Sequence, residues 1–129
     1  MIILGLSVAT SEHHAAALVI DGQVVAAAAE ERFNRIKHYG WSPDGRAGAN
    51  LINTAGLALN DALCREATGW MLAENGLTLD DVDVVALNGI PNRFLGAREP
   101  VVDGRYVFVP HHLAHASVAV RTAPVPIRY

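Results

Sequence analysis

The chain has 129 residues, of which 51% are hydrophobic and 18% charged, which is typical of one globular domain and excludes a disordered segment. The formal net charge of −3 provides no electrostatic basis for binding nucleic acid or an anionic membrane. The single cysteine, Cys64, excludes an internal disulfide and is typical of a buried thiol in a reducing compartment.

Apolar runs such as Val24 to Ala29 are far too short to span a bilayer. The first residues are apolar but lack the basic region of a secretory signal peptide. We therefore expect a cytoplasmic protein with no membrane partner.

Three short apolar runs open the chain and predict three strands, at Ile2 to Val8, Ala15 to Ile20 and Gln23 to Ala29. Asp21 and Gly22 separate the second and third runs. Asp-Gly between apolar runs is a strong hairpin signal because both residues tolerate positive φ. The pattern predicts an antiparallel meander of three strands.

Two helices are predicted in the middle of the chain. Apolar residues recur at helical spacing from about Arg46 to Leu59. A second helix is expected from Asn60 to Asn75, with its N-cap at the first or second residue and Gly76 as the C-cap. Trp70 and Leu72 are expected to face the core.

The last third predicts strands at Val84 to Leu87 and Tyr106 to Val109, with an Asp-Gly turn inside Pro100 to Gly104. A helix is expected from His111 to Val120, directly after a proline. Three antiparallel strands followed by alternating helices and strands predict an α/β fold of the ribonuclease-H-like or actin-like ATPase type. Residues 1–129 would form one partial domain of this kind, incomplete at its C-terminus.

A histidine pair is the first candidate site. His111 and His115 are four residues apart in the predicted helix and share a face, with Cβ atoms about 5–6 Å apart. Two imidazoles at that spacing can bind one divalent metal ion. A pair of surface histidines at a helix start is the alternative, and a full site needs a third ligand that this chain does not obviously offer.

Two polar segments are further candidates. Residues 30–38 follow the third predicted strand directly, at the edge of the sheet where α/β sites are built, and their arginines and lysine can bind phosphate or carboxylate groups. Residues 11–14 connect the first two strands, where an actin-like domain approaches nucleotide phosphates. A solvated charged loop and an ordinary polar turn are the respective alternatives.

Taken together and in this order, these features resemble the carbamoyltransferase family that includes nodulation and antibiotic-tailoring enzymes of the nodulation/cephamycin type. Most of the chain carries the resemblance, except residues 57–75. The matching segments read ILGLS, AAALVIDGQVVAAAAEERFNRIKH, LTLDDVDVVALNG and HHLAHAS. EERFNRIKH and HHLAHAS are the specific ones.

The resemblance implies an ATP-using O-carbamoyltransferase, in which carbamoyl phosphate and ATP give carbamoyladenylate and the carbamoyl group passes to a hydroxyl of a small molecule. His111 and His115 would bind a divalent metal, Fe(II), that orients the adenylate and polarises its carbonyl oxygen. Lys37 and His38 would be the catalytic residues. The residues expected to contact ATP are Glu12, His13, His14, Glu31 and Arg32.

The chain departs from the family pattern in two respects. Glu12, His13 and His14 stand where the family usually has His-Asp-Ser, which puts the chemistry of this loop in doubt. Family members are also several times longer, so the third metal ligand and the domain that forms carbamoyladenylate would lie beyond Tyr129. This implies a portion that is inactive alone, with a complementing C-terminal chain or a homo-oligomer as partner.

Two rival functions remain open from the sequence. The first is a degenerate, non-enzymatic domain that binds nucleotide, metal or another chain, because an exposed edge strand invites pairing. The second is a fragment of an actin-like sugar or acetate kinase. That reading requires a glycine-rich phosphate loop with an aspartate near the first strand, which residues 5–11 do not clearly provide.

Overall fold

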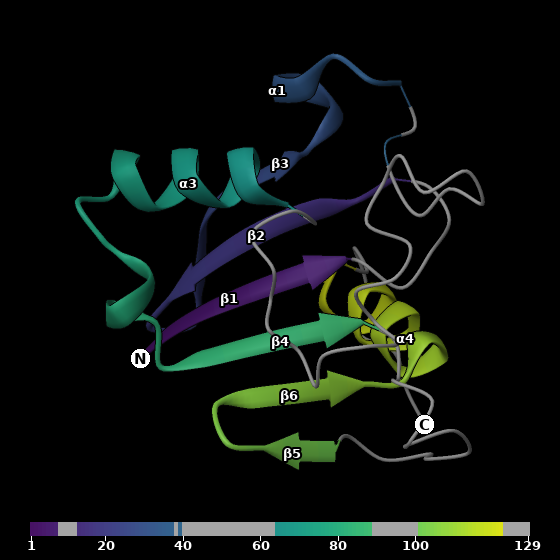
Figure 1. The fold of residues 1–129 in the computed structure, drawn as a ribbon. Helices are drawn as coiled ribbons and strands as arrows, with labels where there is room; N and C mark the ends of the chain where they lie inside the picture. Colours follow the sequence, from purple (N-terminus) through teal and green to yellow (C-terminus); the bar gives the residue numbers. More distant parts are fainter. Residues whose placement is uncertain (8–12, 38, 40–63, 89–100, 123–129) are drawn as a thin grey trace.

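The computed structural model describes residues 1–7, 13–37, 39, 64–88 and 101–122 as a mixed α/β fold (Figure 1). A single sheet carries the strands, and helices lie on both of its faces. In chain order the elements are β1 (Ile2–Ser7), β2 (Ala15–Ile20), β3 (Gln23–Ala29), α1 (Glu31–Asn34), α3 (Arg65–Glu74), the 3-10 helix η1 (Leu79–Asp81), β4 (Val84–Asn88), β5 (Val101–Asp103), β6 (Tyr106–Val109) and α4 (His111–Thr122).

The predicted meander of β1, β2 and β3 is confirmed. β1 and β2 pair antiparallel, and so do β2 and β3. The turn between β2 and β3 consists of Asp21 and Gly22, with φ angles of 48° and 82°. Two successive positive φ values match the twist of the flanking strands, so this hairpin is set by its own two turn residues.

The sheet has six strands in the order β3-β2-β1-β4-β6-β5. β4 pairs parallel with β1, and β6 pairs parallel with β4. β3 runs in the same direction as β1, because two antiparallel pairings separate them. Four strands therefore end at the same side of the sheet, with Ser7, Ala29, Asn88 and Val109, and we call this side the carboxyl edge.

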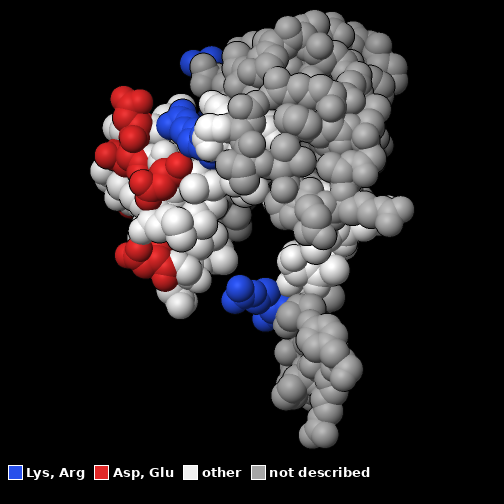
Figure 2. Space-filling model, turned by 90° about the horizontal axis from the view of Figure 1, so that it is seen from below, with Lys and Arg blue, Asp and Glu red and all other residues white. Residues whose placement is uncertain are grey.

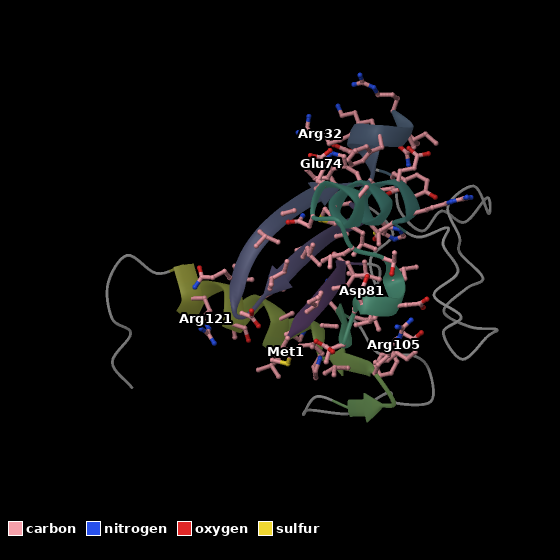
Figure 3. The ribbon with its side chains drawn as sticks, turned by 90° about the vertical axis from the view of Figure 1, so that its left-hand side faces the viewer. Met1, Arg32, Glu74, Asp81, Arg105 and Arg121 are labelled. Carbon is pink, nitrogen blue, oxygen red and sulfur yellow. The ribbon has the colours of Figure 1, made fainter. Side chains whose placement is uncertain are left out.

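The core lies between the sheet and α3. Alternate residues of each strand point to this face, since side chains alternate along a strand. The face opposite the core carries α4, and Figures 1 and 3 show α3 and α4 on opposite sides of the sheet. The buried core residues are Leu4, Leu6, Ala16, Leu18, Cys64, Ala67, Met71, Leu72, Val82, Val85, Leu87 and Phe108.

The second predicted helix is present in part. α3 begins at Arg65, with Cys64 at its N-cap, so the predicted cap at Asn60 or Asp61 is wrong. Trp70 was expected inside but is 42% exposed, whereas Leu72 is buried. Positions two apart are about 200° apart around a helix, so the two side chains cannot both face one core.

The end of α3 is where the glycine signal predicts it. Gly76 has a φ of 65° and donates its N–H to the carbonyl of Ala73, while Leu77 donates to the carbonyl of Leu72. These two bonds form a Schellman motif, which satisfies carbonyls at the helix end. Leu77 packs against the core beside Leu72, so the motif also directs the chain back to the sheet.

The strands and helix of the last third are confirmed with small extensions. β4 and β6 occupy their predicted positions, and α4 continues two residues further than expected. The short edge strand β5 was not predicted; it pairs antiparallel with β6 across the turn at Gly104 and Arg105. The helix predicted from Arg46 to Leu59 lies outside the described residues. None of the described helices is long and apolar enough to cross a membrane.

Candidate functional site

The carboxyl edge brings together the parts of the chain that carry the predicted site residues. His13 and His14 directly precede β2, and α1 directly follows β3. α4 follows β6 after a single proline, Pro110. Sites in α/β proteins form outside the carboxyl ends of parallel strands, and three separate predictions therefore meet at one edge.

The two histidines before β2 have different environments. His13 is exposed and has a left-handed φ of 64°. His14 is 1% exposed, and its ring meets the ring of Tyr39 edge-on, with centroids 5.8 Å apart. The N–H of His14 donates to the carbonyl of Tyr39 at 2.8 Å. His14 thus anchors the connection to β2 on the segment after α1, and only His13 points toward solvent.

The segment after β3 is a single helical turn followed by a basic stretch. Glu31 is half-buried, and Arg32 is exposed. Arg35 ends α1 in the left-handed region, with its N–H donating to the carbonyl of Glu31. Lys37 is exposed in the turn that follows. The two predicted basic ligands of the segment are therefore accessible to an anionic molecule.

Glu30 was not predicted as a site residue, yet it is 3% exposed and holds this segment in place. Its carboxylate accepts hydrogen bonds from the N–H groups of Glu66 and Ala67, at 3.0 and 2.9 Å. These donors belong to the first turn of α3, where backbone N–H groups lack partners inside the helix. Glu30 therefore caps a helix that lies more than thirty residues further along the chain.

The charge of Glu30 also affects its neighbours. Burial, and then the negative charge of Glu30, raise the pKa of Cys64 to about 12. The same two causes in the same order raise the pKa of Tyr39 above its usual value. Both groups stay neutral at physiological pH, so Cys64 is not a thiolate nucleophile or metal ligand here.

A groove of about 380 Å³ lies on the sheet face opposite the core, next to α4. Its floor is a row of small residues from four adjacent strands, aligned by the strand register. A row without large side chains leaves space above the sheet. The strand-end residues Ser7, Asn88 and Val109 of the carboxyl edge also line the groove, and so does Ala114 of α4. The residues of the row are Ala27, Ala17, Gly5 and Ala86.

Two residues with polar side chains line the groove where β1 and β4 end. The side-chain amide of Asn88 donates a 3.1 Å hydrogen bond to the hydroxyl of Ser7. Ligand pockets are commonly apolar with a few fixed polar groups, and this pair has that character. Sequence reasoning missed both residues. Both could have been identified as the polar residue at the end of an otherwise apolar strand.

The predicted metal ligands lie on α4 at the same edge. His111 is the first residue of the helix, and His115 follows four positions later, so the expected spacing of one helical turn is present. His115 is exposed and adjacent to Ala114 of the groove. No cluster of three or more metal-binding side chains occurs among the residues that the structure describes. Glu12 and His38 lie outside those residues.

Charge is unevenly distributed between the two ends of the sheet. Exposed aspartates occur away from the carboxyl edge, at the turn after β2 and around η1. Figure 2 shows acidic side chains grouped on one side of the molecule, with a basic side chain beside them. The basic residues Arg32, Arg35 and Lys37 are exposed just past β3. An anion at the carboxyl edge would therefore meet these cationic groups. At the other end the aspartates lie beside Arg105, which donates to the carbonyl of Leu79, and the N-terminal ammonium, which pairs with Asp21. The exposed aspartates are Asp21, Asp80, Asp81 and Asp83.

The geometry defines a mixed α/β domain whose candidate site lies at the carboxyl ends of its parallel strands. No family model matches the chain. The chain is 33% identical over 141 residues to Nodulation protein NolNO of Sinorhizobium fredii. The match covers 90% of this chain but 20% of that protein, so the chain spans about a fifth of the length of the curated relative it matches.

Proposed function

We propose that this chain is the N-terminal portion of an O-carbamoyltransferase, inactive alone. The main support is the similarity to Nodulation protein NolNO over 90% of the chain, in the family that the motifs at residues 30–38 and 111–117 resemble. The convergence of those two motifs on the carboxyl edge is what a shared site requires. The strand order, with three antiparallel strands and then two parallel to the first, supports an actin-like ATPase domain.

In this proposal the carboxyl edge binds the carbamoyl donor and ATP through their phosphates. Arg32 and Lys37 are exposed cations beside the edge, and both side chains pair well with phosphate oxygens. The remaining ATP contacts are proposed at Glu12, His13 and Glu31, whereas the predicted contact at His14 is replaced by a role in holding the loop, because His14 is 1% exposed. The backbone bonds that hold His14 keep this loop close to the segment of Lys37.

The transfer step forms a bond from the acceptor oxygen to the carbamoyl carbon and breaks the bond to the adenylate phosphate. Lys37 and His38 are proposed as its catalytic residues. A neutral imidazole is suited to take the acceptor hydroxyl proton, and a lysine ammonium stabilises the departing negative charge. The acceptor is a small molecule with a hydroxyl group.

The residues at the start of α4 fit a divalent metal ion in part. In this proposal His111 and His115, which lie one helical turn apart in sequence, would supply two nitrogen ligands, and neutral imidazole suits iron. When bound, Fe(II) would act as a Lewis acid on the carbonyl oxygen of the adenylate. A third ligand would come from another part of the full-length protein.

A second candidate is a non-enzymatic domain that binds another chain. Within the described residues, only β2 pairs with β3, which is seven residues long and lacks charge and proline. An uncharged edge of this kind is open to pairing with a further strand. Size-exclusion chromatography tests self-pairing through β3, because a clean monomer counts against it. Calorimetric titration with ATP and Fe(II) then separates a domain that binds ligand from one that only pairs with another chain.

Activity is tested by mixing this chain with a second, separately expressed chain that contains the C-terminal four-fifths of Nodulation protein NolNO. Carbamoyl phosphate, ATP and a panel of small hydroxyl compounds are then assayed for carbamoyl transfer. We expect transfer only with both chains, and loss of about a hundredfold in rate for Lys37→Ala. Arg121→Ala, at the far end of α4 (Figure 3), is the control. Absence of transfer with every acceptor, together with no iron binding, contradicts the proposal.

Metal binding is tested by anaerobic titration with Fe(II). Either His111→Ala or His115→Ala is expected to weaken binding at least about tenfold, because each removes one ligand. His112→Ala is the matched control, since His112 lies on the same helix but not on the face of the other two. Equal effects of all three substitutions would contradict a site at this pair.

A further inference from the structure

Glu30 stands where three segments of the candidate site meet. Its carboxylate is bonded to the first turn of α3. Its backbone N–H donates to the carbonyl of His14 at 2.9 Å, and its carbonyl accepts from Phe33 and Asn34 in α1. One residue thus connects the loop before β2, the segment of Lys37 and the helix on the core face.

The contacts continue from Glu30 in a closed path. The N–H of His14 donates to the carbonyl of Tyr39, and Tyr39 donates to the carbonyl of Ile36. The rings of Phe33 and Trp70 meet with centroids 5.7 Å apart, which joins α1 to α3 a second time. Phe33 also packs against the core, so the path depends on how α1 is held to α3 and to the sheet.

The bonds of the Glu30 carboxylate are of a strong type. A carboxylate that accepts two backbone N–H bonds makes charge-assisted hydrogen bonds, and the first turn of a helix stabilises negative charge. Burial at 3% exposure keeps water from replacing these bonds. We therefore expect loss of the charge to weaken the attachment of the Glu30 segment to α3 more than the pairing of the strands.

We propose that Glu30 is a positioning residue, which fixes the His13–His14 loop and the Arg32–Lys37 segment relative to each other through the N-terminus of α3. This rests on the proposed function, since it is that function that gives these two segments a common ligand. Glu30 does not contact the ligand in this scheme.

The experiment measures native-state amide hydrogen exchange on the whole chain, with Glu30→Gln as the variant. Glutamine keeps the side-chain length and one acceptor oxygen but loses the charge. Glu74→Gln, at the exposed end of the same helix, is the control. We expect exchange at the N–H groups of His14 and Tyr39 to accelerate at least about tenfold more than exchange in β1 and β4, because local opening costs less than global unfolding.

If Glu30 only stabilises the fold as a whole, hydrogen exchange should become faster by one common factor at all amides. That result overturns the proposal. No change relative to Glu74→Gln overturns it as well. Glu30→Asp, which keeps the charge, should restore part of the protection at His14 and Tyr39. Absence of any restoration would indicate that the carboxylate is not the positioning group.

Calorimetric titration with ATP separates this inference from the proposed function. With ATP bound at the carboxyl edge, Glu30→Gln should raise the Kd about tenfold at unchanged stoichiometry, and Glu74→Gln should not. If the unchanged chain binds no ATP but the selective exchange appears, the nucleotide part of the proposed function fails and the positioning role stands. If exchange changes selectively but the Kd for ATP does not, the proposal that Glu30 positions these two segments for ATP is overturned.

Discussion

The side-chain amide of Asn88 donates a 3.1 Å hydrogen bond to the hydroxyl of Ser7, and these are the last residues of two neighbouring parallel strands. They are 81 positions apart in the chain. The bond joins the ends of β1 and β4, and both residues line the small-residue groove. The polar end of the candidate site is therefore held by a contact between strands and not by a local turn.

A double-mutant cycle with Ser7→Ala and Asn88→Ala tests this contact. The interaction free energy should be about 0.5–1.5 kcal/mol, the usual net value of one hydrogen bond. Asn88→Ala alone should cost more than Ser7→Ala, because Asn88 makes a further interaction. Urea denaturation measures all four proteins, and a coupling of zero contradicts the bond.

Two glycines of similar exposure provide a matched pair of substitutions. An added Cβ meets nothing within 4 Å at either Gly69 or Gly76, but Gly76 has a φ of 65°. Gly76→Ala should therefore destabilise the fold by about 1 kcal/mol through backbone strain. Gly69→Ala, inside α3, should stabilise it by about 0.5–1 kcal/mol. Thermal unfolding measures both, and a shift of the same sign for the two contradicts this account of the helix end.

Phe108 of β6 is 1% exposed and joins the two halves of the sheet to one core. Phe108→Ala should reduce the free energy of unfolding by about 3–5 kcal/mol through lost burial and a residual cavity. Leu113→Ala, on the exposed side of α4 with 37% exposure, should change it by less than about 1 kcal/mol. Chemical denaturation measures the free energy of unfolding of both variants. Similar decreases for the two would mean that β6 does not pack as described.

The Cys64 thiol should resist alkylation in the folded protein. Because burial and the charge of Glu30 raise its pKa to about 12, almost no thiolate is present at pH 8, and thiolate is the reactive form. Labelling with iodoacetamide, followed by mass spectrometry, should be much slower in the native chain than in urea. Rapid native labelling would contradict the buried position.

The same thiol makes stability depend on pH at high pH. The folded state keeps its proton up to about pH 12, whereas the unfolded thiol loses its proton near its ordinary pKa of about 8.5. The native state then binds more protons than the unfolded state, so stability falls as pH rises through this interval. Cys64→Ser should remove that part of the pH dependence, which urea denaturation at several pH values can detect.

Much of the local structure could be predicted because it depends on neighbouring residues. The Asp21–Gly22 turn, the glycine end of α3 and the histidine helix after Pro110 all follow from backbone preferences or short-range periodicity. The prediction that Trp70 faces the core was wrong. It rested on the apolar character of Trp70 alone, and the sequence did not show that α1 would lie beside it. Phe33 of α1 supplies its ring contact.

The candidate site was predictable in its residue types but not in its assembly. The loop of residues 11–14 provided His13, and EERFNRIK and HHLAHAS provided Arg32, Lys37 and His115 as chemically suited groups. The sheet order is what brings these segments to one edge. Glu30 looked like one more charge in a charged segment. Its role appears only when the first turn of α3 lies against it.

By itself the sequence determined the strands β1, β2, β3, β4 and β6, the Asp21–Gly22 turn and the helix α4, because φ preferences and hydrophobic spacing act within a few residues. Only the tertiary structure decided that β4 and β6 continue the meander in parallel, and that the carboxylate of Glu30 caps a helix at Ala67. Such pairings depend on burying both faces of the sheet and on satisfying buried polar groups, and their partners are distant in the chain.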